Sequence, residues 1–90
     1  MQIVDHTLEA GYPNPFSNQT NIRYAIPEPG TVKLEVFDTL GRRVRVLVDA
    51  QQTAGWHEAV FESRNLSAGM YFYRLQAGAF TATRGIILQR

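Results

Sequence analysis

Apolar residues alternate with polar ones along most of the chain, and this alternation constrains the fold more than any other feature. The segment NIRYAI, residues 21–26, has a large apolar side chain at every second position. A period of two is typical of a β-strand with one buried face, whereas an amphipathic helix would show a period of about 3.6. Glycine and proline turns interrupt the alternation at intervals of about 8 to 14 residues. The chain is therefore expected to be all-β, with no helix of useful length.

The alternation also predicts which side chains point into the core. Four strands have a clear inward set: Ile22, Tyr24 and Ile26; Val32, Leu34 and Val36; Val44, Val46 and Val48, with Leu47 on the outer face; and Tyr71, Tyr73 and Leu75. Residues 56–62 leave two inward sets open, either His57, Ala59 and Phe61 or Trp56, Glu58 and Val60. The first set is favoured, because the second would bury the Glu58 carboxylate without an obvious partner.

Turns and connections separate these strands. Asp38–Gly41 begins with aspartate and ends with glycine, which is typical of a type I turn. Gly78 can supply a positive φ just before the final strand, Thr81–Gln89. Residues 50–55 could hold a helical turn, but a segment of six residues that ends in glycine favours a connection.

These elements predict an antiparallel immunoglobulin-like β-sandwich of about seven strands. A single open sheet would leave one of its apolar faces in water, so the strands are expected to form two layers. The segment around Ile3 and Leu8 is a weaker candidate for an edge strand. Ninety residues suffice for one small domain with a single core.

Composition argues against several classes of protein. The net charge is +1, with nine basic and eight acidic residues interleaved, which does not favour a nucleic-acid partner. No apolar run approaches the roughly 20 residues of a transmembrane segment. The absence of cysteine excludes disulfides and thiolate metal sites. Residues 1–11 lack the pattern of a signal peptide, so any leader is expected on a longer parent chain.

Residues that could carry chemistry are sparse. His6 and His57 have no metal-ligand spacing, and Glu58 and Glu62 form at most a solvated pair on one strand. No nucleophile motif, phosphate-binding glycine loop or calcium loop is present in the sequence. We therefore expect a non-catalytic module without a cofactor or a metal ion.

A binding module is an alternative class. The alternation leaves several aromatic side chains without an assigned place in the core, among Tyr12, Phe16, Phe37, Trp56, Phe72 and Phe80. A row of exposed rings on a β-sandwich can stack on sugar faces, as in carbohydrate-binding modules. These rings belong to different strands, which favours the interpretation that they cover loop ends and the second face of the sandwich. A passive spacer between the modules of an extracellular enzyme is a third alternative.

Five segments, in this order, resemble one known family. They are YPNPF (Tyr12–Phe16), the long run Thr20–Asp49, AGWHEAVFE (Ala54–Glu62), LSAGMYFYRLQAG (Leu66–Gly78) and TATRGIILQ (Thr81–Gln89). Together they closely resemble the type A C-terminal sorting domain of the type IX secretion system, over nearly the whole chain from about Leu8 onward.

The resemblance implies a sorting and cell-surface attachment module fused to a larger secreted protein, often a hydrolase or an adhesin. The parent would cross the inner membrane of a Gram-negative bacterium on its own leader and pass through the periplasm. The type IX outer-membrane translocon would then recognise this domain, and a sortase-like peptidase would remove it at the surface, leaving the cargo attached to the cell or released into the medium. Residues 1–11 would be a linker or edge segment from a removed cargo, with Met1 as the start of a fragment, and residues 12–90 would be the sorting domain.

The resemblance also implies roles for individual residues. The address would be the final strand, at Thr83, Arg84, Gly85, Ile86, Ile87, Leu88, Gln89 and Arg90. Structural roles would fall on Gly41, Gly55, Gly69, Tyr71 and Gly78, and on a segment that we call the clasp, made of Tyr12, Pro13, Asn14, Pro15 and Phe16. We expect the prolines to hold the clasp extended while its two aromatic rings pin it across the mouth of the sandwich. Tyr71 is expected to bury its ring and bond a neighbouring loop, as in a tyrosine corner.

Two features depart from the usual pattern of the family. The clasp is followed by Ser17–Gln19 and so lacks a third proline, and Gly85 stands where a basic residue is common. Both concern local recognition more than the fold. A partner could read the final strand by strand addition or by capture of its terminal carboxylate, while Ile86–Leu88 also close the sandwich.

Overall fold

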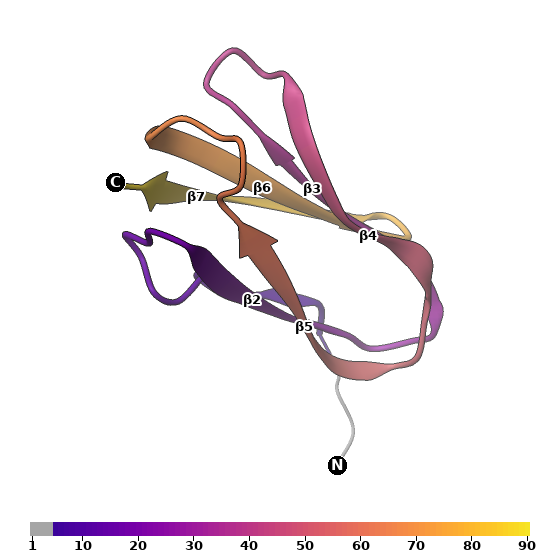
Figure 1. Cartoon of the computed structure of the whole chain (residues 1–90). Coiled ribbons are helices and arrows are strands. Elements are labelled where there is room, and N and C mark those ends of the chain that lie inside the picture. The colour runs from indigo at the N-terminus through magenta and orange to yellow at the C-terminus, as the bar shows by residue number, and fades with distance from the viewer. Residues whose placement is uncertain (1–4) are drawn as a thin grey trace.

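The computed structural model describes residues 5–90, which form seven β-strands and no helix. The strands are β1 (Thr7–Leu8), β2 (Gln19–Ile26), β3 (Gly30–Phe37), β4 (Arg43–Gln52), β5 (Gly55–Glu62), β6 (Gly69–Ala77) and β7 (Phe80–Leu88). One sheet has the order β1-β2-β5 and the other has the order β4-β3-β6-β7, and every pairing is antiparallel. Figure 1 shows the two sheets as facing layers. The prediction of an all-β sandwich of about seven strands is therefore confirmed.

The inner faces of the two sheets share one core. Its fully buried large side chains are Phe16, Ile22, Tyr24, Ile26, Val32, Leu34, Val36, Phe61, Tyr73, Leu75, Ile86 and Leu88. The inward sets predicted for β2, β3 and β6 are confirmed, because each of their members is buried. Removing these side chains from water is the main favourable contribution to folding.

The favoured inner face of β5 is also confirmed. Ala59 and Phe61 are buried, whereas Trp56 and Val60 remain 43% and 46% exposed. His57 is half-buried, and its ring stacks on a core tyrosine of β2. Glu58 therefore keeps its carboxylate in solvent, as the cost of burying a charge requires.

The prediction for β4 is wrong at two residues. Val46 is 47% exposed, and Leu47 packs against the core. Leu34 of β3 pairs with Val48, but the next residue of β3, Glu35, pairs with Val46, so Leu47 is an extra residue in β4. Such a β-bulge shifts the following side chains to the opposite face of the strand. Simple alternation therefore fails at this point.

The ends of the chain and of β4 also refine the prediction. β4 continues to Gln52 and β5 begins at Gly55, so four of the six residues of the connection expected at residues 50–55 belong to strands. Leu8 pairs with Tyr24 and is buried, which confirms an edge strand at this residue. Ile3 lies outside the described residues.

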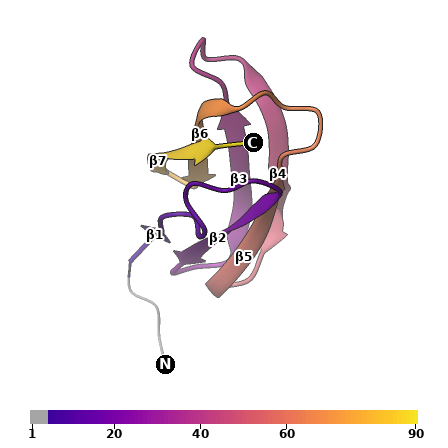
Figure 2. The same cartoon turned by 60° about the vertical axis from the view of Figure 1, so that its left-hand side comes forward.

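β7 forms one edge of the four-stranded sheet. Figure 2 shows β7 above the chain that connects β1 to β2 and contains the clasp. An edge strand has one row of backbone N–H and C=O groups that its own sheet does not satisfy. The residues that lie beside this row therefore determine which partners β7 can bind.

Candidate functional site

Side chains of β7 divide between the core and the surface. Ile86 and Leu88 point inward and are 0% and 1% exposed, whereas Ile87, between them, is 41% exposed. Thr83 and Gly85 also lie at the surface. The structure thus places Thr83–Leu88 of the expected address on one edge strand, and exposed and buried residues alternate from Gly85 to Leu88.

The clasp pairs with the C-terminal end of β7. The Phe16 N–H donates to the Ile87 carbonyl oxygen at 3.0 Å, and the Gln89 N–H donates to the Phe16 carbonyl oxygen at 2.8 Å. The Ile87 N–H donates to Oδ1 of Asn14 at 3.1 Å. The Phe16 ring is buried and packs against the Phe61 ring, with centroids 5.2 Å apart. The clasp is therefore bound to β7 by backbone pairing as well as by its ring.

The prediction that the clasp is extended and pinned by both rings is wrong. Its path bends at Pro13, Asn14 and Pro15, and both of its X–Pro peptide bonds are cis. Tyr12 is 80% exposed and is held only through its backbone, which pairs with Asn21 of β2. Because the chain bends, its first residue pairs with one sheet and its last residue pairs with the other. The clasp consequently links the two sheets.

The segment before the clasp is anchored by Tyr73 and Arg84, a role that the sequence did not predict for either residue. The Tyr73 hydroxyl accepts a hydrogen bond from the Gly11 N–H and donates one to the Glu9 carbonyl oxygen, both at 2.8 Å. Burial raises the pKa of this hydroxyl, with smaller opposing effects from the Gly11 N–H and Arg84, so it stays protonated and can donate. Nε of Arg84 donates to the Leu8 carbonyl oxygen at 2.6 Å. In the sequence, the one signal that could have indicated this anchor is Gly11, the glycine directly before YPNPF.

We expect Gly11→Ala to lower the free energy of unfolding by about 1–3 kcal/mol, because overpacking a core forces its neighbours to shift. The added Cβ would lie 2.6 Å from Cδ1 of Ile86 and 3.2 Å from Oγ1 of Thr20, and both neighbours are fully buried. Urea denaturation of the two purified proteins measures the change. Gly30→Ala is the matched control, because no atom lies within 4 Å of its added Cβ. Equal losses in the two variants would contradict the packing argument.

Arg90 turns back onto the domain. Its guanidinium donates to the carbonyl oxygens of Ser63, at 2.9 Å, and Leu66, at 2.5 Å. These residues belong to the connection between β5 and β6. The last residue of the expected address is therefore engaged within the domain.

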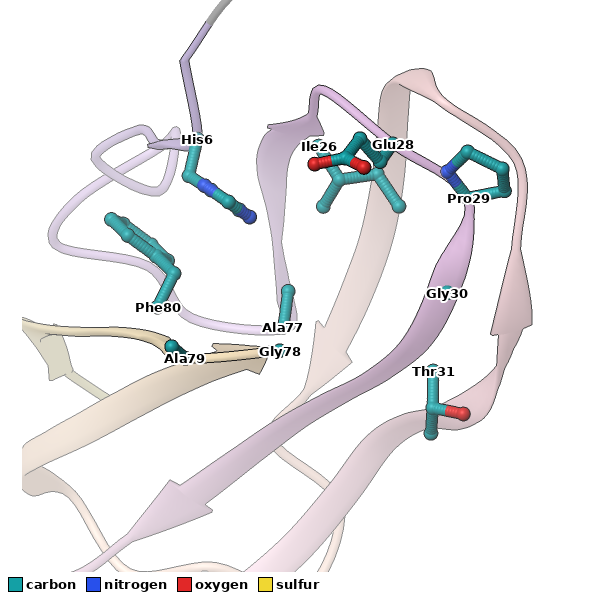
Figure 3. Close-up of a pocket in the computed structure, with 10 residues that line it drawn as sticks. All are labelled: His6, Ile26, Glu28, Pro29, Gly30, Thr31, Ala77, Gly78, Ala79 and Phe80. Atoms are coloured by element: carbon teal, nitrogen blue, oxygen red, sulfur yellow. The ribbon is translucent and has the colours of Figure 1, made fainter.

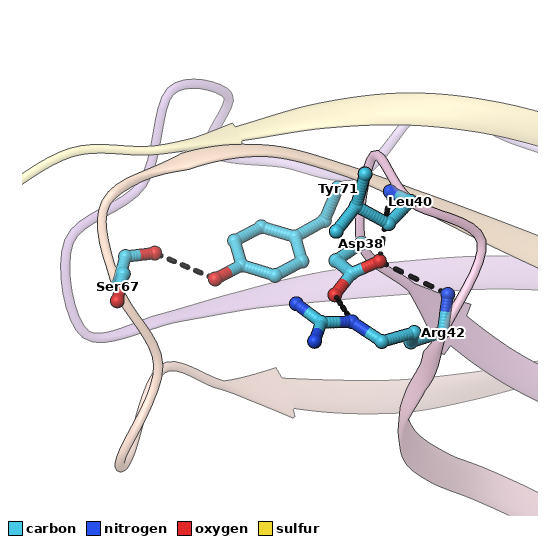
Figure 4. Close-up of polar contacts among 5 residues, drawn as sticks. All are labelled: Asp38, Leu40, Arg42, Ser67 and Tyr71. Carbon is cyan, nitrogen blue, oxygen red and sulfur yellow. Dashed lines mark hydrogen bonds and ion pairs between the residues drawn. The ribbon is translucent and has the colours of Figure 1, made fainter.

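Tyr71 and the β3–β4 turn lie together at the opposite end of β6 from Gly78 (Figure 4). The Tyr71 ring is buried, and its hydroxyl donates to the Ser67 carbonyl oxygen at 2.6 Å, which is the geometry expected of a tyrosine corner. Asp38 accepts hydrogen bonds from the N–H groups of Leu40 and Arg42. The Arg42 N–H contributes most to a lowered pKa of this carboxyl. These contacts stabilise the turn predicted at Asp38–Gly41.

The four glycines assigned structural roles share one backbone property. Their φ values are positive, at 80° for Gly41, 122° for Gly55, 150° for Gly69 and 60° for Gly78. An added Cβ at any of them would meet nothing within 4 Å. Glycine is therefore favoured at these positions by the positive φ and not by a lack of space. At Gly78 the positive φ allows the tight turn between β6 and β7.

The outer face of β6 and β7 carries an apolar patch, which we define as Met70, Phe72 and Ile87. Their exposed fractions are 41%, 39% and 41%. Gly85 pairs with Phe72, and a Cβ at Gly85 would lie 3.6 Å from the Phe72 ring. The missing side chain at Gly85 therefore leaves this ring open along the edge of the sheet.

A buried carboxylate lies next to this patch on β3. Glu35 is 3% exposed, and its oxygens lie 2.9 Å from Nη1 of Arg43 and 3.4 Å from Nη2 of Arg74. The hydrogen bond from Arg43 is the main cause of a lowered pKa of Glu35, and burial opposes it. Each charge in this cluster has an opposite neighbour, so the cluster is a structural ion pair on the sheet.

Two other surface features are an open cavity and an exposed tryptophan. A cavity of about 500 Å³ lies at the end of the sandwich between the β2–β3 and β6–β7 turns, beside stacked rings of His6 and Phe80 (Figure 3). Among residues 5–90, Glu28 is the only acidic residue that lines it. Trp56 faces outward on the other sheet, but the Arg23 guanidinium lies 4.6 Å from the centre of its ring. Neither surface gathers the convergent polar groups of a small-molecule site.

Residues 5–90 contain no group of three His, Asp or Glu side chains placed to hold a metal ion. Within the same range, no helix is long and apolar enough to cross a membrane.

Comparison with known proteins assigns the chain to a family. A family model described as a secretion system C-terminal sorting domain matches residues 10–89, which include the clasp and all of β7. No curated protein and no solved structure gave a significant match. Domains of this family are in general non-catalytic. The chain belongs to the C-terminal sorting domains of the type IX secretion system, and it carries a signal that directs an attached protein through that system to the cell surface.

Proposed function

We propose that Thr83–Arg90, which comprise the C-terminal part of β7 and the two residues after it, are the address that the type IX translocon reads. Residues 12–90 act as one sorting unit, and residues 1–11 link it to a larger secreted cargo such as a hydrolase or an adhesin. The parent crosses the inner membrane on its own leader and passes through the periplasm. A sortase-like peptidase removes the domain after export.

The edge position of β7 is the observation that carries this proposal. Ile86 and Leu88 attach the strand to the core, while Thr83, Gly85 and Ile87 remain at the surface. A partner can therefore contact an edge strand without unfolding the sandwich. One segment can serve both packing and recognition, because the two roles use alternate residues.

The anchored N-terminal segment supports a fixed attachment of the cargo. The Tyr73 side chain of β6 and the Arg84 side chain of β7 form hydrogen bonds with the backbone of Leu8, Glu9 and Gly11. These bonds join residues more than 60 positions apart in the sequence. A cargo fused before them would leave the domain at a defined point beside the address strand.

We expect a fluorescent cargo with a periplasmic leader, fused to residues 1–90, to reach the cell surface only in a host with a working type IX system. The matched host lacks the translocon, so the difference in surface fluorescence measures sorting. Deleting Ile86–Arg90 should abolish display, because it removes five of the eight residues of the address and two core side chains. Cargo retained in the periplasm of both hosts would contradict the proposal.

The same fusion tests the carbohydrate-binding alternative. Retention on an insoluble polysaccharide that Trp56→Ala reduces would favour a sugar-binding module. The structure gives this alternative little support, because Tyr12 and Trp56 lie on the β1-β2-β5 side and Phe72 lies on the outer face of the other sheet.

A further inference from the structure

At each residue of β7, the backbone N–H and C=O groups point either toward β6 or away from it. Ile87 directs its N–H and its C=O toward the clasp, away from β6. The pairing of β6 with β7 is regular from Phe80 to Leu88, with no bulge. In a regular antiparallel strand, every second residue directs its backbone groups to the same side. Thr81, Thr83 and Gly85 must therefore also direct their N–H and C=O groups away from β6.

These three residues form what we call the open edge. No hydrogen bond within residues 5–90 pairs their outward N–H or C=O groups with another part of the chain. The clasp pairs only at Ile87 and Gln89, so it stops just before Gly85. β7 thus already pairs with its own chain at Phe16, whereas the outward backbone groups of the open edge are left unpaired.

Side chains at the open edge define the chemistry of a partner. Arg84 is exposed, and among residues 5–90 no acidic side chain pairs with it. Its guanidinium is fixed in place by the bond from Nε to the Leu8 carbonyl oxygen. On the outer face, Gly85 leaves the Phe72 ring uncovered. A complementary strand would place an acidic residue beside Arg84 and an apolar residue over Gly85.

We propose that the open edge of β7 binds an extended segment of the translocon by strand addition, with an acidic side chain of that segment beside Arg84. This inference rests on the proposed function and specifies how the address is read. Main-chain hydrogen bonds supply affinity in this mode of binding, and the flanking side chains supply specificity. Association through the charge should weaken as salt screens it.

A second copy of the chain fits the open edge less well. Residues 81–85 read TATRG and contain no acidic residue. Two copies that pair through this segment would therefore leave both Arg84 side chains without a partner. A heterologous strand can provide the missing charge.

Thr83→Pro is the sharpest variant for testing this inference. It removes an N–H that points away from β6, so the pairing between β6 and β7 stays intact, as for prolines on natural edge strands. The pyrrolidine ring also obstructs a strand that approaches from the edge. Thr83→Val is the matched control, because it has the same shape as threonine and keeps the N–H.

In the export assay we expect Thr83→Pro to reduce surface display of the fused cargo by about tenfold or more, because it removes one backbone hydrogen bond and its ring obstructs the added strand. Thr83→Val should export at the wild-type level. Wild-type export with equal export of both variants would overturn the open edge while leaving the sorting function intact. Failure of the wild-type fusion itself would instead count against the proposed function.

Amide hydrogen exchange gives a second measurement that does not depend on the proline variant folding. In the free wild-type domain, the amides of Thr81, Thr83 and Gly85 should exchange quickly and that of Arg84 slowly. Purified translocon should protect the three fast amides, and the protection should weaken as ionic strength rises. Protection that appears only at β4 or β5, or a dimer of the free domain that protects the same amides, would overturn the proposal.

Discussion

Phe16→Ala is expected to lower the free energy of unfolding by about 3–5 kcal/mol, the range for truncating a buried aromatic side chain. The Phe16 ring is 2% exposed and packs against Phe61. Its removal leaves a cavity between the sheets and weakens the backbone pairing of the clasp with β7. Small domains are stable by only about 5–15 kcal/mol, so this loss would take a large part of the total. Urea denaturation followed by tryptophan fluorescence measures it.

Tyr12→Ala is the control for that experiment. Tyr12 belongs to the same clasp and is also aromatic, but its side chain is 80% exposed. Surface substitutions of this kind usually change stability by no more than about 0.5 kcal/mol. If the two variants lost similar stability, the assignment of Phe16 as the buried anchor of the clasp would be wrong.

Ile86→Asp should destabilise the domain by more than about 4 kcal/mol and leave little folded protein at room temperature. Ile86 is 0% exposed and lies on the inner face of β7. A carboxylate at this position would have to lose its hydration in an apolar core or take up a proton to enter it. Circular dichroism and thermal unfolding of the purified variant measure the result.

Ile87→Asp introduces the same charge one residue further along. Ile87 is 41% exposed on the outer face, so the carboxylate keeps its water and the cost should be about 1 kcal/mol. The domain is expected to remain folded, which allows its export to be measured separately from its stability. An Ile87→Asp domain that unfolds as completely as Ile86→Asp would contradict the observed division of β7 into inner and outer residues.

Alternation predicted most of the core, because the pattern within a single regular strand is enough to identify its buried face. Ile22, Tyr24 and Ile26 needed no tertiary information, and neither did the set on β6. In β5, a local argument about the charge of Glu58 chose the correct face. These inferences succeed because strand geometry repeats every two residues.

The same rule failed in β4, where the structure inserts extra residues opposite β3. Val46 and Leu47 are both apolar and β-compatible, so either could have faced the core. The bulge at Leu47 depends on pairing with Leu34 and Glu35, which lie more than ten positions earlier in the chain. A register between strands is a property of two segments, and one segment alone does not define it.

The sequence by itself determined the class of fold, the inner faces of the regular strands and, through five ordered segments, the resemblance to a sorting domain that the family comparison confirms. Only the tertiary structure decided that the clasp bends to join the two sheets, that Tyr73 and Arg84 hold the segment before it, and that the edge of β7 is paired at Ile87 and open at Thr83. The physical reason is the separation along the sequence between the residues that make contact. Side-chain alternation and turn chemistry are local, whereas the contacts that β6 and β7 make with the clasp and the segment before it join residues about 60 to 75 positions apart and exist only once the core has brought the strands together.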